Sequence, residues 1–409
     1  MAKRLLILTD APTAPLHSPR MRYLIVNLAK RGWLCTVAYE QLPGSGFTFE
    51  QATNIPMPYY KSNKGLGHAW AWLTDKLFDN KERRLYRLLT QSCKAADFDA
   101  ILCSAFNTFP LMTAARLSRE WRLPLVADLR DIAEQWGESK FAQHLTYTGV
   151  TGIDEWLTQQ YNSRCILRRD KALRQASAIT TVSSWHQRFM TERFGKAELI
   201  YNGYDEQAYT PKDEHSSAFI ISYTGRIYDF SLRDPGLLFE ALKQMADDAT
   251  LPAELELHFY CEAALHEALQ AKALAAGISD RLHLHGYVSN AEVLQVLRQS
   301  AISLLLTNKA GVNGAHGIMT TKFFEALGVE KPVLCVRSDE ECLAEVIRDT
   351  NAGVAATTAE EVKAFVLDKY KEWQNKGFTR QAVNIDKKQL FTRQYQAEQF
   401  EKLLREVSE

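Results

Sequence analysis

The sequence has no long apolar run and no closely spaced pair of cysteines, and each absence excludes a class of protein. A transmembrane helix needs about 20 predominantly apolar residues, and no run approaches that length. The seven cysteines are scattered without Cys-x-x-Cys spacing, which favours reduced core thiols over a disulfide framework or a zinc site. The first apolar run, Leu5–Leu8, stops at Thr9 with no small-residue cleavage site after it. We therefore expect a buried strand rather than a signal peptide, and a cytoplasmic protein.

Net charge is also absent, because 49 Lys and Arg residues balance 49 Asp and Glu residues. The charges are unevenly placed, since residues 1–200 hold 27 basic against 18 acidic side chains and residues 201–409 hold 22 against 31. Aromatic residues interleave with basic ones from Trp70 to Lys94, and a second basic stretch runs from Arg164 to Arg174. Such stretches are typical of a surface that meets anionic lipid or an anionic acceptor, and equally of a solvated helix face. Peripheral attachment to the inner membrane face and a plain solvated surface both stay open, and no nucleic-acid partner is expected.

One ordinary core is too small for 409 residues, so two domains are expected. Short apolar runs typical of buried strands alternate with longer amphipathic runs typical of helices. This alternation predicts an α/β fold with two Rossmann-like parallel sheets, each covered by helices on both faces. We place the domains at residues 1–205 and 206–385, followed by an amphipathic helix, Leu390–Val407, within residues 386–409.

The most informative segment runs from Gly311 to Pro332. Three glycines precede Thr320 and Thr321, either of which can cap a helix, and the N–H groups at such a helix end bind phosphate well. Lys322 adds a cation, and Glu325 adds a hydrogen-bond acceptor one turn further along the same face. This pattern predicts a nucleotide site, with phosphate at the threonines and lysine and ribose at the glutamate. An ordinary strand–helix turn with a capping threonine and a surface lysine is the alternative.

Other polar residues follow predicted strands at their carboxyl ends, where open α/β sheets bind ligands. They are Asp10, Ser18 and Arg20 after the first strand, Asp128, Arg130 and Asp131 after Ala127, and Gly225 and Arg226 shortly after Tyr223. This distribution predicts a ligand cleft between two facing domains.

Several short segments, in their order and spacing, carry a resemblance to a known family. They are Asp128–Asp131, Ala178–Ser183 followed by Ile200–Asp205, Tyr223–Arg226 with Arg233–Pro235, and Lys322–Glu325 with Lys331–Pro332. Together they resemble glycosyltransferase family 4, a large bacterial group of GT-B-fold enzymes that build surface polysaccharides. The resemblance covers nearly the whole chain and implies that the C-terminal helix crosses back to the N-terminal domain.

The resemblance also implies an activity and roles for individual residues. A sugar would pass, with retention, from a nucleoside-diphosphate sugar to a saccharide or lipid-linked acceptor. The donor nucleotide would be held by Gly225, Arg226, Arg233, Thr320, Thr321, Lys322 and Glu325, with both arginines on the diphosphate. The acceptor side would include Ser18, Arg20 and Arg130. No metal or other cofactor is implied, because cationic side chains and the helix end neutralise the leaving diphosphate.

Two positions depart from the family pattern. Gly317 stands where many members have the first glutamate of a Glu-x7-Glu motif, so the donor sugar would be contacted by backbone or by neighbours such as His316. Many members also have a catalytic histidine where Ser104–Asn107 lies here. Asn107 and Asp131 are the candidates to substitute for it, and a purely structural role is the alternative for both.

Rival interpretations follow from the same residues. A nucleotide-sugar 2-epimerase of the same fold would use the same nucleotide site, and a non-catalytic binding subunit would account for both departures. A dehydrogenase is not expected, because Asp10–Pro15 rather than Gly-x-Gly-x-x-Gly follows the first strand. His283 and His285 alternate along a predicted strand, and we expect them at a sheet edge rather than at a metal.

Overall fold

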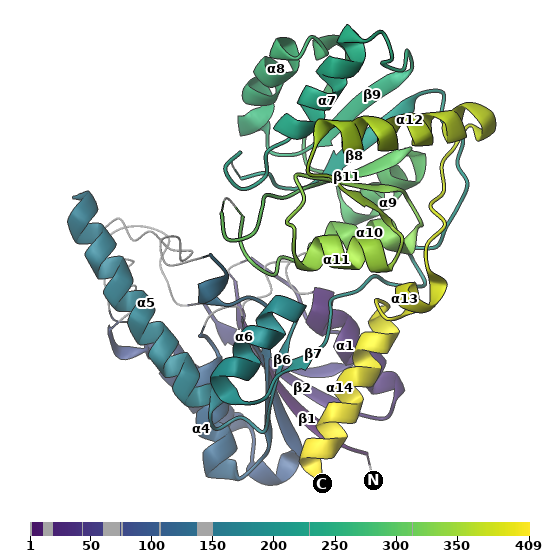
Figure 1. Cartoon of the computed structure of the whole chain (residues 1–409). Coiled ribbons are helices and arrows are strands. Elements are labelled where there is room, and N and C mark those ends of the chain that lie inside the picture. Colours follow the sequence, from purple (N-terminus) through teal and green to yellow (C-terminus); the bar gives the residue numbers. More distant parts are fainter. Residues whose placement is uncertain are drawn as a thin grey trace. The chain divides into compact units, whose positions relative to one another are not determined.

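The computed structural model describes residues 2–10, 19–42, 44–59, 74, 77–105, 108–136, 150–228, 230–312 and 314–409. These residues form two compact units (Figure 1). The N-terminal unit comprises Met1–Tyr201 and Arg393–Glu409, and the C-terminal unit comprises Asn202–Thr392. Each unit has its own sheet and its own apolar core, which confirms the predicted fold class.

The N-terminal unit is built on seven parallel strands in the order β3-β2-β1-β4-β5-β6-β7. Its strands are β1 (Arg4–Thr9), β2 (Leu34–Gln41), β3 (Ala52–Pro58), β4 (Ala100–Ala105), β5 (Leu125–Leu129), β6 (Ala178–Thr181) and β7 (Glu198–Leu199). The helices described in this unit are α1 (Pro19–Lys30), α3 (Asn80–Ser92), α4 (Leu111–Trp121), α5 (Thr151–Leu173), α6 (Ser184–Phe194) and α14 (Arg393–Ser408), with short 3-10 turns at Ala95–Asp97 and Ala133–Trp136.

The central strands β1, β4 and β5 are buried on both faces, which agrees with their largely apolar sequences. Leu6 and Leu8 of β1 lie in one core cluster, together with apolar side chains of α4. Leu5 and Ile7 lie in the other, where α1 contributes residues spaced by three and four along one helix face. Alternate side chains of a strand point to opposite faces, so β1 joins the two clusters.

Helix α14 belongs to the N-terminal unit, although the chain reaches it from the C-terminal unit. Ala397, Phe400 and Leu404 are buried in the same cluster as the core-facing side of α1. The predicted return of the C-terminal helix is therefore confirmed. Its predicted start at Leu390 is wrong, because α14 begins at Arg393. Phe391 lies in the C-terminal unit, where its ring centre is 5.6 Å from that of Phe324.

The C-terminal unit is built on six parallel strands in the order β10-β9-β8-β11-β12-β13. Its strands are β8 (Phe219–Thr224), β9 (Leu255–Tyr260), β10 (Leu282–His285), β11 (Ile302–Leu306), β12 (Val333–Val336) and β13 (Gly353–Ala355). The helices described here are α7 (Gly236–Asp247), α8 (His266–Ala275), α9 (Asn290–Gln299), α10 (Thr321–Gly328), α11 (Cys342–Asp349), α12 (Ala359–Lys376) and α13 (Ile385–Gln389), with 3-10 turns at Ala263–Leu265 and Ser279–Arg281.

Strand β3 and the long helix α5 are not expected from their sequences. Pro56 and Pro58 cannot donate to a sheet ladder, but among the described strands β3 pairs with β2 alone, at the sheet edge, where proline is tolerated. Helix α5 has 23 residues and carries charged side chains along its length. Among the residues described, no helix combines the length and apolar character that crossing a membrane requires.

Candidate functional site

The C-terminal unit gathers its predicted residues where β8 and β11 end. Gly225 and Arg226 follow β8 directly, and the loop after β11 leads to Thr320, the N-terminal cap of α10. Strands β8 and β11 are neighbours, and the chain order of the sheet reverses between them. Open α/β sheets bind their ligands at this position.

Gly225 and Lys322 are in direct contact across this point. A Cβ added to Gly225 would lie 2.5 Å from Cε of Lys322 and 2.8 Å from its Nζ. Gly225 also has a φ of +122°, which side-chain-bearing residues rarely adopt. Because residue 225 is a glycine, there is room beside it for the end of the Lys322 side chain. The Lys322 ammonium lies 5.4 Å from the ring centre of Tyr223.

Arg226 and Arg233 lie together beside the same strand end. The guanidinium of Arg233 donates to the backbone carbonyl of Arg226, which also accepts from the Tyr223 hydroxyl at 2.5 Å. The Tyr228 ring centre lies 5.8 Å from the guanidinium of Arg226 and 5.1 Å from that of Arg233. Asp234, the neighbour that could have neutralised Arg233, instead accepts from the Gly236 N–H and pairs with Lys272 at 3.3 Å.

The surroundings of Lys322 lower the pKa of its side-chain amine. Burial, and then the nearby charge of Arg233, lower the pKa of Lys322 to about 7, although the carboxylates of Glu325 and Glu262 act in the opposite direction. A bound anion would favour the charged ammonium and raise this pKa again. Lys322 is therefore the cation of this group whose charge responds most to an anionic ligand.

Helix α10 holds Lys322 and Glu325 on one side by burying the other. Phe323, Phe324 and Leu327 are fully buried, whereas Lys322 and Glu325 are half-buried. Thr320 and Thr321 begin the helix, and its first N–H groups point beyond its start. The structure thus brings together the lysine, the glutamate and the helix end that the sequence predicts.

Glu262, two residues beyond the end of β9, has a role that the sequence did not predict. Its carboxylate accepts from the N–H of Ile227 at 3.0 Å and from that of Tyr228 at 2.7 Å, so it fixes the loop that carries Arg226. Burial raises the pKa of Glu262, but the backbone donors outweigh this and hold it below the ordinary value. Its place just after a strand was the signal that could have identified it.

His316 and Gly317, the residues predicted for the donor sugar, both bind a second missed residue, Glu341. One oxygen of Glu341 lies 3.0 Å from Nδ1 of His316, and the other accepts from the Gly317 N–H at 2.9 Å. Glu341 directly precedes α11, in the loop after β12, and β12 pairs with β11. The Glu341 carboxylate therefore lies beside Gly317, the position at which the sequence lacks the glutamate of the family pattern.

Arg20 lies inside the N-terminal unit rather than on its surface. Its guanidinium binds Asp128 through two bonds, of 3.1 and 2.8 Å, and also donates to the Tyr201 carbonyl at 3.1 Å. Ser104 and Thr180 donate to the same carboxylate at 2.9 and 2.7 Å. Burial raises the pKa of Asp128, but the charge and hydrogen bonds of Arg20 hold it below the ordinary value. With a relative exposure of 2%, Arg20 joins α1 to the sheet and does not face an acceptor.

Arg130 and Asp131 follow β5 and are less enclosed. Arg130 pairs with Asp10 at 2.5 Å. Asp131 accepts from Gln135 at 3.1 Å, and the Gln135 carbonyl oxygen lies 2.7 Å from Nε2 of His186. Burial raises the pKa of Asp131 to about 6, so this carboxyl group exchanges its proton near neutral pH. The other predicted residues of this unit, Ser18 and Asn107, lie outside the described residues.

Two family models match the chain. Residues 20–208 match the model described as Glycosyltransferase Family 4, and residues 218–368 match the model described as Glycosyl transferases group 1. The chain is a family 4-like glycosyltransferase of the GT-B fold. These matches confirm the predicted resemblance to glycosyltransferase family 4 and the prediction that the protein is an enzyme. No curated protein sequence matches this glycosyltransferase.

Solved structures share this fold at low identity. Anabaena HepE in complex with UDP is 14% identical to this chain, with a TM-score of 0.66, and the match covers 98% of this chain and 99% of HepE. HepE in complex with UDP-glucose is 16% identical, with a TM-score of 0.65. Sucrose-phosphate synthase from Thermosynechococcus elongatus is 13% identical with a TM-score of 0.66, covering 99% of each chain. A Listeria monocytogenes protein described as a candidate UDP-N-acetylglucosamine 2-epimerase is 14% identical with a TM-score of 0.53, covering 97% of this chain and 95% of that one.

Proposed function

We propose that this glycosyltransferase binds a nucleoside-diphosphate sugar in its C-terminal unit and transfers the sugar with retention. The observation that supports this most is the meeting of Arg226, Arg233 and Lys322 beside the start of α10. Such a group of cations at a helix end suits a diphosphate. That HepE was solved with UDP and UDP-glucose supports a nucleotide sugar as the donor class.

The proposed chemistry rests on stabilising the leaving diphosphate. As the bond to the sugar breaks, negative charge develops on the diphosphate oxygens, and the two guanidinium groups and Lys322 stabilise it. Glu325 accepts hydrogen bonds from the ribose hydroxyls, and His316, oriented by Glu341, contacts the sugar. In transfer with retention the diphosphate helps to deprotonate the acceptor hydroxyl on the same face, and Asp131 is the candidate group for a further proton transfer.

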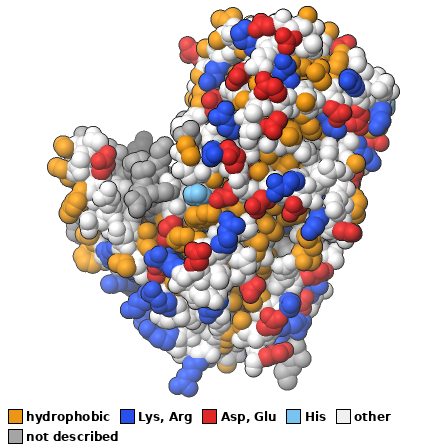
Figure 2. Space-filling model, viewed as in Figure 1, with side chains coloured by type: hydrophobic (Ala, Val, Ile, Leu, Met, Phe, Trp, Pro, Cys, Tyr) orange, Lys and Arg blue, Asp and Glu red, His pale blue; other side chains and the backbone are white. Residues whose placement is uncertain are grey.

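For the acceptor we propose a saccharide or lipid-linked molecule bound by the N-terminal unit, with peripheral attachment to an anionic membrane. The start of α5 supports attachment, because Val150, Ile153 and Trp156 are 54%, 48% and 58% exposed. Figure 2 shows hydrophobic side chains over this end of α5 and Lys and Arg side chains gathered towards its other end. Arg164 and Arg168 pair with Asp79, however, so the second basic stretch is less available to lipid than its sequence predicts.

The donor is tested by thermal-shift measurements with UDP-, GDP-, ADP- and dTDP-sugars, since a ligand that binds the folded state raises its apparent stability. One nucleotide should stabilise the wild type, and Arg226→Ala should weaken that effect. Arg22→Ala, a change of a surface arginine in the N-terminal unit, is the control. If no nucleotide sugar stabilises the protein, the proposed donor site is wrong.

Two further assays separate the alternatives. Incubation with donor alone should leave the sugar unchanged, whereas conversion to a 2-epimer would establish the epimerase instead. Co-sedimentation with vesicles containing anionic lipid should occur at low salt and weaken at high salt. Absence of binding at low salt would remove the membrane from the proposal without affecting the donor site.

A further inference from the structure

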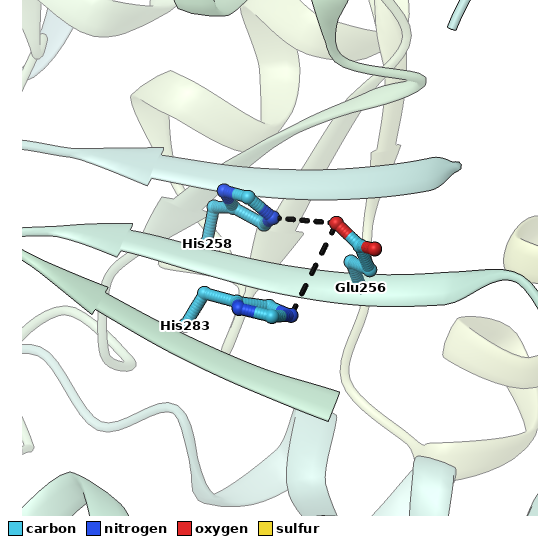
Figure 3. A group of neighbouring side chains, drawn as sticks. All are labelled: Glu256, His258 and His283. Atoms are coloured by element: carbon cyan, nitrogen blue, oxygen red, sulfur yellow. Dashed lines mark hydrogen bonds and ion pairs between the residues drawn. The ribbon is translucent and has the colours of Figure 1, made fainter. Parts of the chain in front are cut away.

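Three side chains of the kind that bind metals meet at the edge of the C-terminal sheet (Figure 3). Glu256 and His258 lie on β9, and His283 lies on β10, the edge strand. The strands are parallel, with His283 directly opposite His258. Because strand side chains alternate with a period of two, all three project from the same face.

The distances between their donor atoms are close to those in a coordination sphere. Oε2 of Glu256 lies 2.9 Å from Nε2 of His258 and 4.0 Å from Nε2 of His283, and all three residues offer ligand atoms within 4.8 Å of one another. Donors bound to one tetrahedral zinc ion at roughly 2.0–2.2 Å stand about 3.3–3.6 Å apart. The first of these distances must lengthen by about 0.4 Å and the second shorten by about 0.4 Å to reach this range. The His283 side chain, which is 43% exposed, has room for such a shift.

A fourth side chain orients the central histidine. Nε2 of His285 lies 3.2 Å from Nδ1 of His258, and the ring of Tyr260 stacks on that of His285 at 4.3 Å. If Nε2 of His258 gives its lone pair to a metal, Nδ1 must carry the proton and donate it to a neighbour. Nε2 of His285 is placed to accept this hydrogen bond from the Nδ1–H of His258.

We propose that Glu256, His258 and His283 form a binding site for a zinc-class divalent transition-metal ion, with His285 as the positioning residue for His258. Two imidazoles and one carboxylate are a donor set that such ions prefer, and three protein ligands leave a position for water. An ion bound here links the edge strand β10 to β9 and stabilises the C-terminal unit. It takes no part in the proposed sugar transfer, whose cationic donor-binding residues follow β8 and β11.

The site is tested by titrating the full chain, without a histidine tag, with Zn²⁺ in a calorimeter. The wild type should bind one ion at this site, and His258→Ala and His283→Ala should abolish that binding. His285→Ala should weaken it by about 10–100-fold, as expected for a residue that orients a metal ligand. His215→Ala, which removes an exposed histidine of the same unit, should bind Zn²⁺ as the wild type does.

Two results would overturn the proposal. One is that the wild type takes up no Zn²⁺, and the other is that His258→Ala and His283→Ala bind it as tightly as the wild type. Nucleotide-sugar affinity, measured on the same samples, should be unchanged in both variants and shows that they are folded. Replacement by Co²⁺ gives a second measurement, because its visible absorption reports coordination by these residues and should be lost in the variants.

Discussion

Nδ1 of His316 lies 3.0 Å from one carboxylate oxygen of Glu341, while the other oxygen of Glu341 accepts a hydrogen bond from Gly317. His316 follows β11 and Glu341 follows the neighbouring strand β12. Gly317 stands where the family resemblance leads one to expect a glutamate side chain, and here a carboxylate arrives from another loop. We infer that Glu341 orients His316 for contact with the donor sugar.

Replacing Glu341 should therefore slow transfer more than it weakens nucleotide binding. Losing a hydrogen bond to a charged group costs about 1.5–3 kcal/mol, or roughly 10–150-fold in rate. We expect this loss in kcat for Glu341→Ala, with little change in the Kd for the nucleoside diphosphate. Glu340→Ala is the matched control, because the exposed Glu340 pairs with Lys309 at the surface. An unchanged kcat, or an equal loss of nucleotide affinity, would contradict the inferred role.

Donor binding should take up a proton at Lys322. With its pKa at about 7 in the free protein, this amine is about 90% neutral at pH 8, and a bound diphosphate should restore its charge. Affinity for a nucleotide sugar should therefore fall as the pH rises from 6 to 9. Calorimetry in buffers of different ionisation enthalpy should detect uptake of nearly one proton at pH 8 and little at pH 6. Lys322→Met should bind more weakly and take up none, and an equal uptake in this variant would exclude Lys322 as the acceptor.

Glu325→Ala should weaken binding of the nucleoside diphosphate by about 1.5–3 kcal/mol, because a charged acceptor of the ribose hydroxyls is lost. The free nucleobase should bind the variant and the wild type equally weakly, since it has no ribose. Glu240→Ala, which removes an exposed carboxylate on α7, is the control. If Glu325→Ala keeps full affinity while remaining folded, the ribose is held elsewhere.

The fold and the residues around α10 could be predicted because their signals are local. Alternation of apolar runs with amphipathic ones identifies two parallel sheets, and Thr320, Thr321, Lys322 and Glu325 all lie within six consecutive residues at the start of α10. Glu262 and Glu341 could not be given roles in this way. Each carboxylate accepts hydrogen bonds from a loop that follows a different strand, and no local sequence pattern predicts such a long-range contact.

Arg20 is the opposite case, because the sequence predicts a role at the acceptor side and the structure places the residue in the core. In sequence it is one of several polar residues after the first strand, so an acceptor role was as reasonable for it as for Arg130. Its partner Asp128 is 108 positions away, and the burial of both depends on how α1 packs on the sheet. Long-range packing of this kind decides whether a polar residue faces a ligand or the core.

The Arg20–Asp128 pair should accordingly be important for stability. Removing one partner of a buried ion pair costs about 3–5 kcal/mol, because the remaining charge is left without compensation. Arg20→Met should lower the free energy of unfolding of the N-terminal unit by this amount. Urea unfolding followed by tryptophan fluorescence can measure the loss, since Trp33 is buried in the same cluster as α1.

Two further variants separate the charge from the packing in this test. Adding Asp128→Asn to Arg20→Met removes the uncompensated charge, so the double variant should be more stable than Arg20→Met alone. Arg22→Ala, on the same helix, removes a side chain that is 40% exposed and lies 3.7 Å from Glu50, and should change stability by less than about 0.5 kcal/mol. If Arg20→Met is as stable as Arg22→Ala, the buried pair contributes nothing and Arg20 becomes available again as an acceptor residue.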